Sequence, residues 1–174
     1  RDTRARRRQK VDSISGSVAG RGVYSEKRLV SEESSIAITD RAGLDSWERA
    51  LLLSRFALEK KSYDLVLIDV REATSIADYF VICSRRSHRQ VQTIAQGIEE
   101  NLAKLGIRPI SIEGLSRGQW VLMDFSDVIV HIFYQPIREF YDLETLWAHA
   151  PRVELPEPYS TLVQQFQIRA DGSF

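Results

Sequence analysis

The sequence predicts an α/β fold of the α+β type, in which a mixed sheet of about five strands carries flanking helices, mainly on one face. Three observations support this prediction. Helical and strand periodicities alternate between residues 44 and 153, and twelve of the chain's aromatic residues fall in that stretch. Two late strands also follow one another closely enough to form a hairpin. At 174 residues, the chain has room for one domain with appendages.

The first helix is predicted to begin near Asp45. Asp45 followed by Glu48 is typical of a helix start, and an apolar stripe follows it. The stripe ends at Lys60 and Lys61, where the helix dipole favours cations.

Two short strands and a second helix are expected next. The runs at 65–68 and 79–83 are rich in β-branched and aromatic residues and are bounded by acidic residues, which indicates strands. Ser87 is a suitable N-cap for the helix that follows, and Gly106 stands where a left-handed residue commonly ends a helix.

The last third of the domain is predicted to contain three strands and a final helix. The strands are expected at 108–113, 119–125 and 127–133, with the last two joined tightly near Ser126. Pro136 is a good first-turn residue for the final helix. Its apolar residues are Phe140, Leu143, Leu146 and Trp147.

Both faces of the predicted hairpin are apolar. Alternation places Val121, Met123 and Phe125 on one face, and Trp120 and Leu122 on the other. Either one face is an exposed patch that marks a partner site, or helices cover both faces. The sequence leaves both alternatives open.

The sequence divides into three segments. Residues 1–43 contain a single aromatic residue and are expected to form a mostly disordered N-terminal arm. Residues 44–153 are the predicted folded domain, and residues 154–174 are a C-terminal tail, expected to be extended with one short helix at most.

The zero net charge of the chain hides an uneven distribution. Residues 1–28 carry nine basic and three acidic residues, so they have a net charge of +6 and the remainder has −6. A basic run can bind nucleic acid through counterion release. Because the run lacks interleaved aromatic residues, the binding would be blind to sequence. The candidate RNA contacts in the arm are Arg4, Arg6, Arg7, Arg8 and Lys10.

Composition excludes several classes of protein. The single cysteine, Cys83, cannot form an internal disulfide, which favours a reducing compartment. No apolar run is long enough to span a bilayer, so no membrane partner is expected. The predicted location is the cytoplasm of a bacterium. An organelle matrix or stroma is the alternative, because the Arg- and Ser-rich start has features of a transit peptide.

No active site can be assembled from the sequence. A nucleotidyl-transfer site needs a Gly-Ser turn and closely spaced acids that hold Mg²⁺, and Gly-Ser occurs only in the flanks. Cys83 ends an apolar strand, which is more typical of a small buried residue than of a nucleophile. No catalytic residue, metal site or cofactor is predicted. Arg85 and Arg86 precede the second helix and could contact a phosphate, although a solvated loop is the simpler interpretation.

Several strings in the domain, taken in order, resemble the ribosomal silencing factor family, also called RsfS or Iojap. They include Ile-Ala-Asp-Tyr-Phe-Val-Ile at 76–82 and Trp-Val-Leu-Met-Asp at 120–124. The other matching strings lie at 89–91, 113–114, 127–133 and 138–147. The resemblance implies a fold related to nucleotidyltransferases without their catalytic residues.

The resemblance also implies a function without catalysis. Members of the family bind the large ribosomal subunit through its protein numbered fourteen, prevent the small subunit from joining, and so repress translation when nutrients are scarce. The resemblance also allows a homodimer. The residues that match as candidates for the partner-binding surface are Trp120, Leu122, Asp124, Phe125 and His131. For Trp120, the alternative is a place in the core.

The chain departs from the family pattern at two places. Ser126 stands where the family commonly has a glycine, which questions a turn that needs a positive φ. Arg85 and Arg86 stand where a glycine commonly follows the second strand. Two rival functions remain at this stage. One is a ribosome-assembly adaptor that binds RNA through the basic arm, and the other is a degenerate nucleotidyltransferase.

Overall fold

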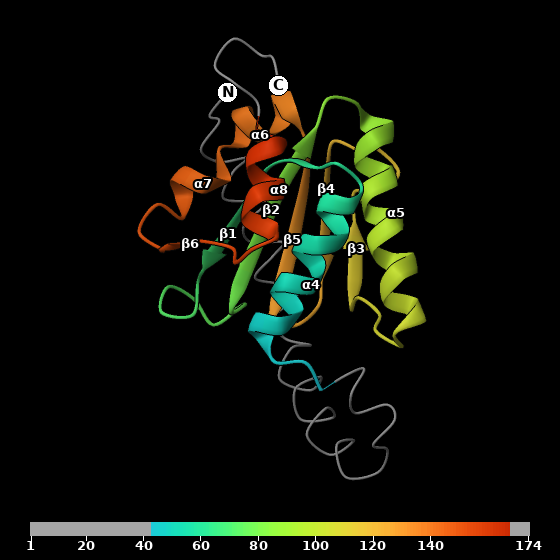
Figure 1. Cartoon of the computed structure of the whole chain (residues 1–174). Coiled ribbons are helices and arrows are strands. Elements are labelled where there is room, and N and C mark those ends of the chain that lie inside the picture. The colour runs from blue at the N-terminus through green and yellow to red at the C-terminus, as the bar shows by residue number, and fades with distance from the viewer. Residues whose placement is uncertain (1–42, 168–174) are drawn as a thin grey trace.

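The computed structural model describes residues 43–167. Its elements are α4 (Ser46–Glu59), β1 (Tyr63–Asp69), β2 (Tyr79–Arg85), α5 (His88–Lys104), β3 (Ser111–Glu113), β4 (Trp120–Asp124), β5 (Val128–Tyr134), α6 (Gln135–Tyr141), α7 (Leu143–Leu146), β6 (Arg152–Val153) and α8 (Tyr159–Gln165). Figure 1 shows one sheet with helices packed around it. The predicted fold class is confirmed. The expected disordered arm lies outside the described residues.

The sheet is mixed, with the strand order β3-β4-β5-β2-β1-β6. The central strands β2 and β5 pair in parallel, and every other neighbouring pair is antiparallel. β6 is the sixth strand, beyond the five predicted, and it pairs only with Leu67 and Ile68 of β1. A two-residue strand has too little alternation to be detected in a sequence.

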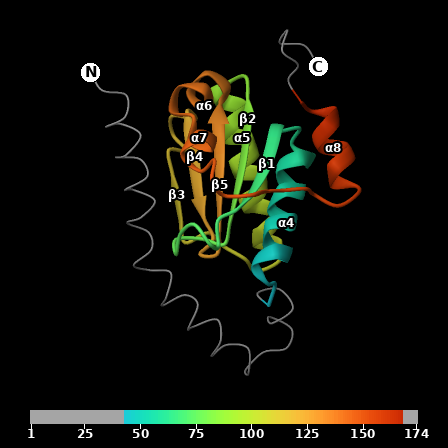
Figure 2. The ribbon, with the colours of Figure 1, turned by 90° about the vertical axis from the view of Figure 1, so that its left-hand side faces the viewer.

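Two apolar cores lie on opposite faces of the sheet. On one face, α4, α5 and α8 enclose what we call the helix-side core (Figure 2). On the other face, α6, α7 and the connection 70–77 enclose a smaller loop-side core. Every residue of β4 is buried, as are the first six residues of β5. The alternative in which both faces of the hairpin are covered is therefore the one that the structure supports.

The helix starts are those that the sequence predicts. Asp45 caps α4 in a capping box, because its side chain accepts from the Glu48 amide at 2.7 Å and Glu48 accepts from the Asp45 amide at 3.0 Å. Ser87 caps α5 by accepting from the Gln90 amide at 3.2 Å.

The final helix is broken in two, whereas the sequence predicts a single continuous helix. Asp142 adopts the left-handed conformation with φ 46° and ψ 53°, so α6 ends there and α7 starts in a new direction. Asp tolerates this conformation better than most residues with a side chain. The break buries Leu143 and Trp147 in the loop-side core, whereas Phe140 and Leu146 remain exposed.

The packed part of the chain continues beyond residue 153. Tyr159, Leu162, Val163 and Phe166 of the α8 region pack against the helix-side core. The carbonyl of Phe166 accepts from the amide of Asp64 at 3.1 Å, which ties the end of α8 to β1.

Candidate functional site

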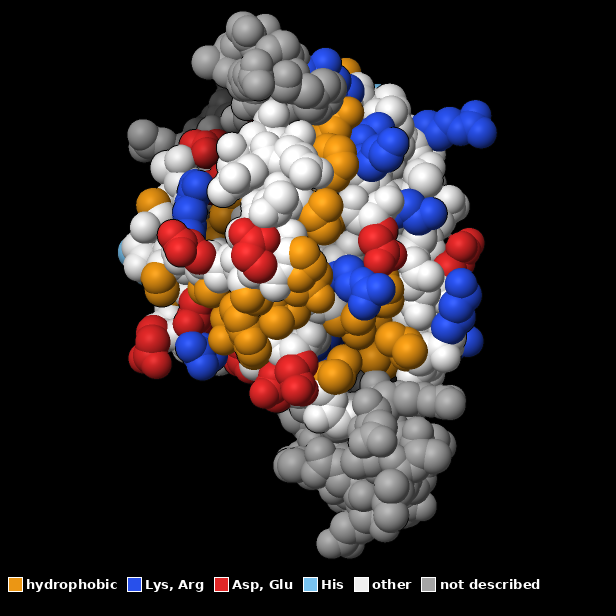
Figure 3. Space-filling model, in the orientation of Figure 1, with side chains coloured by type: hydrophobic (Ala, Val, Ile, Leu, Met, Phe, Trp, Pro, Cys, Tyr) orange, Lys and Arg blue, Asp and Glu red, His pale blue; other side chains and the backbone are white. Residues whose placement is uncertain are grey.

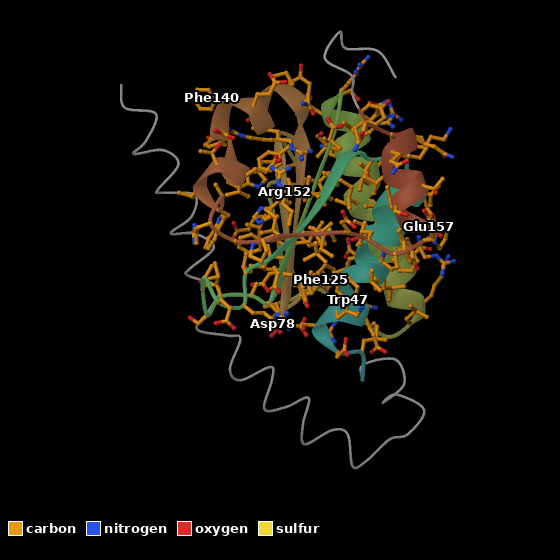
Figure 4. The ribbon with its side chains drawn as sticks, turned by 60° about the vertical axis from the view of Figure 1, so that its left-hand side comes forward. Trp47, Asp78, Phe125, Phe140, Arg152 and Glu157 are labelled. Carbon is orange, nitrogen blue, oxygen red and sulfur yellow. The ribbon has the colours of Figure 1, made fainter. Side chains whose placement is uncertain are left out.

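The β4–β5 hairpin carries the residues that the family resemblance marks as partner-binding. Trp120 lies opposite Phe133, Leu122 opposite His131, and Asp124 opposite Ile129. These pairs confirm the predicted alternation, because Trp120, Leu122, Ile129 and Phe133 belong to the loop-side core. Phe125 belongs to the helix-side core, and Figure 4 shows it near Trp47 and Asp78 at one end of the sheet.

None of the five candidate residues forms an exposed patch. Trp120 is 6% exposed, Leu122, Asp124 and Phe125 are each 3% exposed, and His131 is fully buried. On the loop-side face, the α6–α7 segment covers the hairpin at Tyr141, whose ring centroid lies 5.0 Å from that of Trp120, whereas Phe125 is buried in the helix-side core. Trp120 also stacks on Phe133 at 4.8 Å. These side chains can shape a surface but contribute little of their own area to it.

His131 is a neutral core residue. Burial lowers its pKa to about 3. Its Nδ1 accepts a hydrogen bond from Nε1 of Trp120 at 3.1 Å, which places the imidazole proton on Nε2. Nε2 is buried without a hydrogen-bond partner among the described residues. A histidine in this state is neither a base nor a charged contact near neutral pH.

The turn of the hairpin has the positive φ that the departure from the family pattern called into question. Ser126 adopts φ 78°. The side chain of Asp124 accepts from the Ser126 amide at 2.8 Å, and the amide of Phe125 donates to the Val128 carbonyl at 2.9 Å. The buried carboxylate of Asp124 therefore supports a conformation that glycine would adopt more readily.

The largest exposed apolar side chains lie beside the hairpin, on α6 and α7. Phe140 is 44% exposed and Leu146 is 43% exposed. Figure 4 shows Phe140 on the outer side of α6. Its ring lies 5.2 Å from that of Tyr141, which in turn rests on Trp120. We call Phe140, Tyr141 and Leu146 the α6–α7 patch. The sequence places Phe140 and Leu146 in the apolar stripe of the predicted final helix. Apolar spacing cannot reveal the break at Asp142 that exposes these two side chains.

A cleft of about 850 Å³ lies between β1 and the α6–α7 segment. Its main charged groups pair with one another. Arg138 donates to Glu144 at 2.7 Å, to the hydroxyl of Ser84 at 3.1 Å and to the carbonyl of Asp64 at 2.8 Å. Arg152 also donates to Glu144, at 3.2 Å. This network joins α6 and α7 to the sheet, so its role in the fold is clear.

The structure gives no support to nucleophilic or metal chemistry in the part of the chain that it describes. Cys83 is fully buried on β2, and burial raises the pKa of its thiol to about 12. Within residues 43–167, no group of three or more His, Cys, Asp and Glu side chains is placed to hold a metal ion. None of the helices described there is long and apolar enough to cross a membrane.

The candidate RNA contacts divide into two groups. Arg4, Arg6, Arg7, Arg8 and Lys10 lie outside the described residues. Arg86 is exposed after β2, and Arg85 is half-buried with its guanidinium carbon 4.4 Å from the centre of the Tyr63 ring. Arg85 also donates to the carbonyl of Lys61, which fixes its position.

Comparisons with known proteins agree with the resemblance. Residues 44–172 match the model of the family described as "Ribosomal silencing factor during starvation". The chain is 39% identical over 97 residues to the ribosomal silencing factor RsfS of Bacillus subtilis, covering 56% of this chain and 82% of that protein. It is 29% identical over 107 residues to the chloroplastic protein Iojap of Arabidopsis thaliana, covering 62% of this chain and 44% of that protein.

A solved structure has a similar fold. A crystal structure of a Chromobacterium violaceum protein superposes with a TM-score of 0.59 at 27% identity, and covers 68% of this chain and 99% of that protein. Because the family model matches well over half of the sequence, the chain belongs to the ribosomal silencing factor family.

Proposed function

We propose that this protein binds the large ribosomal subunit through its protein numbered fourteen and prevents the small subunit from joining. Translation would thereby be repressed when nutrients are limiting, and no reaction would be catalysed. The observation that carries the proposal is the family match across residues 44–172, which includes nearly all of the described structure. The buried Cys83 and the neutral His131 also support a binding role rather than a catalytic one.

The α6–α7 patch is the surface that we propose for docking. Aromatic side chains are favoured interface anchors because they bury a large area with few rotatable bonds. A standard interface buries about 800 Å² on each partner, so the patch would form its centre and polar neighbours its rim. The five candidate residues of the hairpin would then contribute indirectly, because they stabilise the hairpin against which α6 and α7 pack. They are Trp120, Leu122, Asp124, Phe125 and His131.

Contacts with ribosomal RNA are proposed as a supplement to protein docking. Their candidates are the basic residues of the arm together with Arg85 and Arg86. A homodimer formed through the α6–α7 patch would compete with docking, because both would cover the same apolar side chains.

Sedimentation of mixed ribosomal subunits tests the proposal. The purified full chain is added to dissociated subunits, and a sucrose gradient is run under conditions that permit joining. We expect the protein to sediment with the large subunit and the amount of joined ribosomes to fall. The double variant Phe140→Ser/Leu146→Ser should lose both effects, whereas Phe140→Leu/Leu146→Met keeps the patch apolar and should retain them.

Two results would contradict this function. The first is unhindered joining at saturating protein, and the second is sedimentation with the small subunit alone. Calorimetry with a nucleoside triphosphate and Mg²⁺ addresses the enzymatic rival, since measurable affinity would revive it. Loss of large-subunit binding when residues 1–43 alone are removed would favour the adaptor that acts through its arm.

A further inference from the structure

Cations from several distant parts of the sequence meet where α4 ends and α5 begins. The carbonyl of Lys61, just after α4, accepts from Arg85 at the end of β2. The neighbouring Lys60 instead lies against the middle of α5, because a Cβ added to Gly97 would come within 2.5 Å of its Cε. Figure 3 shows Lys and Arg side chains gathered over this end of the molecule. Arg86 and Arg89 are both exposed there.

A fourth segment reaches the same place. A Cβ added to Gly118, in the loop between β3 and β4, would lie 2.5 Å from the carbonyl oxygen of His88 in the first turn of α5. The loop therefore packs against that turn. Arg117, which directly precedes Gly118 and is exposed, lies close to the turn as a result. We call the resulting surface the α5-start patch, which consists of Lys61, Arg85, Arg86, Arg89 and Arg117.

Fold stability explains only part of this arrangement. Lys60 and Lys61 follow the C-terminus of α4, where the helix dipole favours cations. Arg86 and Arg89 flank and enter the N-terminus of α5, where the dipole disfavours them, and no acidic residue stands in that first turn. A locally unfavourable placement of charge is expected where a binding partner compensates for it.

The surroundings leave the patch with an excess of positive charge. The stretches 60–63, 84–98 and 114–119, which carry the patch, contain no Asp or Glu. Four acids border these stretches in the sequence, namely Glu59, Asp64, Glu99 and Glu113, and Glu59 pairs with Arg55 at 2.9 Å.

The patch is also positioned rather than loosely solvated. Arg85 stacks over the ring of Tyr63. The ring of His88 packs edge-on against Tyr134 at 4.4 Å between centroids. The hydroxyl of Ser87 accepts a hydrogen bond from the Gln90 amide. The backbone amides of the first two residues of α5 have no acceptor within the helix, so these amides face outward at its N-terminus.

From this placement of charge we infer that the α5-start patch binds the phosphate backbone of folded RNA, independently of the basic arm. Several cations beside the N-terminus of a 17-residue helix suit a row of phosphates. No exposed Phe, Tyr or Trp side chain stands among them for base stacking, so recognition would be of shape and charge rather than sequence. The inference depends on the proposed function only in naming ribosomal RNA as the natural ligand.

Salt-dependent RNA binding tests the inference with the full chain. The probe is a 20-base-pair RNA duplex of arbitrary sequence, titrated between 50 and 200 mM salt. The patch variant is Lys61→Gln/Arg89→Gln. The control is Lys104→Gln/Arg108→Gln, which removes the same charge from exposed positions at and beyond the opposite end of α5.

We expect the patch variant to weaken binding and to reduce the slope of log affinity against log salt by about 1.4–1.8, since each lost phosphate contact contributes about 0.7–0.9. The control should keep the wild-type slope. Thermal unfolding of both variants shows that the fold is intact, and the patch variant should not melt below the control. Equal slopes in the two variants would overturn the inference.

Two further arms separate the alternatives. Vesicles containing anionic lipid test a membrane surface, and if they bind as tightly as RNA and lose binding in the patch variant, the assignment to RNA is wrong. The subunit gradient on the same variants separates this inference from the proposed function. If the wild-type protein does not bind large subunits but binds the RNA duplex, and the patch variant weakens that RNA binding, only the proposed function is overturned.

Discussion

Nε1 of Trp120 donates a hydrogen bond to Nδ1 of His131, 3.1 Å away on the neighbouring strand β5, and both rings are buried. The bond joins two polar groups that would otherwise be stranded in the loop-side core. Above the pair lies Tyr141, the residue that connects Trp120 to the exposed Phe140. The hairpin thus supports the α6–α7 patch through aromatic packing.

Replacing Trp120 by alanine should therefore act on stability first. A buried Trp→Ala change costs about 3–5 kcal/mol, and it also leaves Nδ1 of His131 without its donor. Urea unfolding measures the effect, with Phe140→Ala as a control that should cost less than about 1 kcal/mol because Phe140 is 44% exposed. Wild-type stability combined with lost ribosome binding would show instead that Trp120 contacts the partner directly.

His131 should make stability depend on pH. Its folded-state pKa is about 3, whereas an unfolded histidine titrates near 6.5. As the pH falls below about 6.5, the unfolded state binds a proton that the folded state does not, so the free energy of unfolding decreases by about 1.4 kcal/mol per pH unit. The contribution is fully present above about pH 6.5.

Urea unfolding between pH 5 and pH 7.5 checks this dependence. His131→Gln keeps an acceptor for Trp120 but does not titrate in this range. In this variant, the slope of the unfolding free energy against pH should therefore be smaller by about 1.4 kcal/mol per pH unit, the contribution of one proton. An unchanged slope would mean that the folded state also takes up the proton.

Ser126→Gly should stabilise the protein. Ser126 has φ 78°, and a left-handed conformation costs an L-residue about 1–2 kcal/mol. Glycine relieves that cost but adds freedom to the unfolded chain, so we expect a net gain of about 0.5–1 kcal/mol. Thermal unfolding measures it. Asp124→Ala is the opposite control, because it removes the acceptor of the Ser126 amide and should destabilise the turn.

Arg89→Glu should separate stability from RNA affinity. It replaces a cation in the first turn of α5 by an anion, which the helix dipole favours by about 0.3–1 kcal/mol. We therefore expect a higher melting temperature together with weaker, less salt-dependent RNA binding. Arg55→Glu is unsuitable as a comparison because Arg55 pairs with Glu59, so Arg108→Glu, away from the patch, serves as the control.

Much of the fold could be predicted because its local signals agree. The strands β2 and β5 are runs of β-branched and aromatic residues, and the capping side chains of Asp45 and Ser87 mark the starts of α4 and α5. The break at Asp142 could not be predicted, because neither glycine nor proline stands there and the apolar spacing continues across it.

The candidate site was harder to predict than the fold. Alternation correctly grouped Trp120 with Leu122, but it cannot tell a covered face from an exposed one. What covers the hairpin is the α6–α7 segment, whose position depends on long-range contacts such as Arg138 with Ser84. For the α5-start patch, the sequence indicates Arg85 and Arg86 as a possible phosphate contact but not the cations that join them, since Lys61 and Arg85 meet only through the pairing of β1 with β2.

The parallel pairing of β2 with β5 also bears on how the chain folds. Tyr79 pairs with Val128, so the centre of the sheet joins two antiparallel units that lie far apart in the sequence. The connections within the antiparallel pairs are residues 70–78 between β1 and β2 and residues 125–127 between β4 and β5, whereas pairing β2 with β5 requires a much longer loop to close. The slow step of folding should therefore be the formation of this parallel pairing, whose connection contains α5.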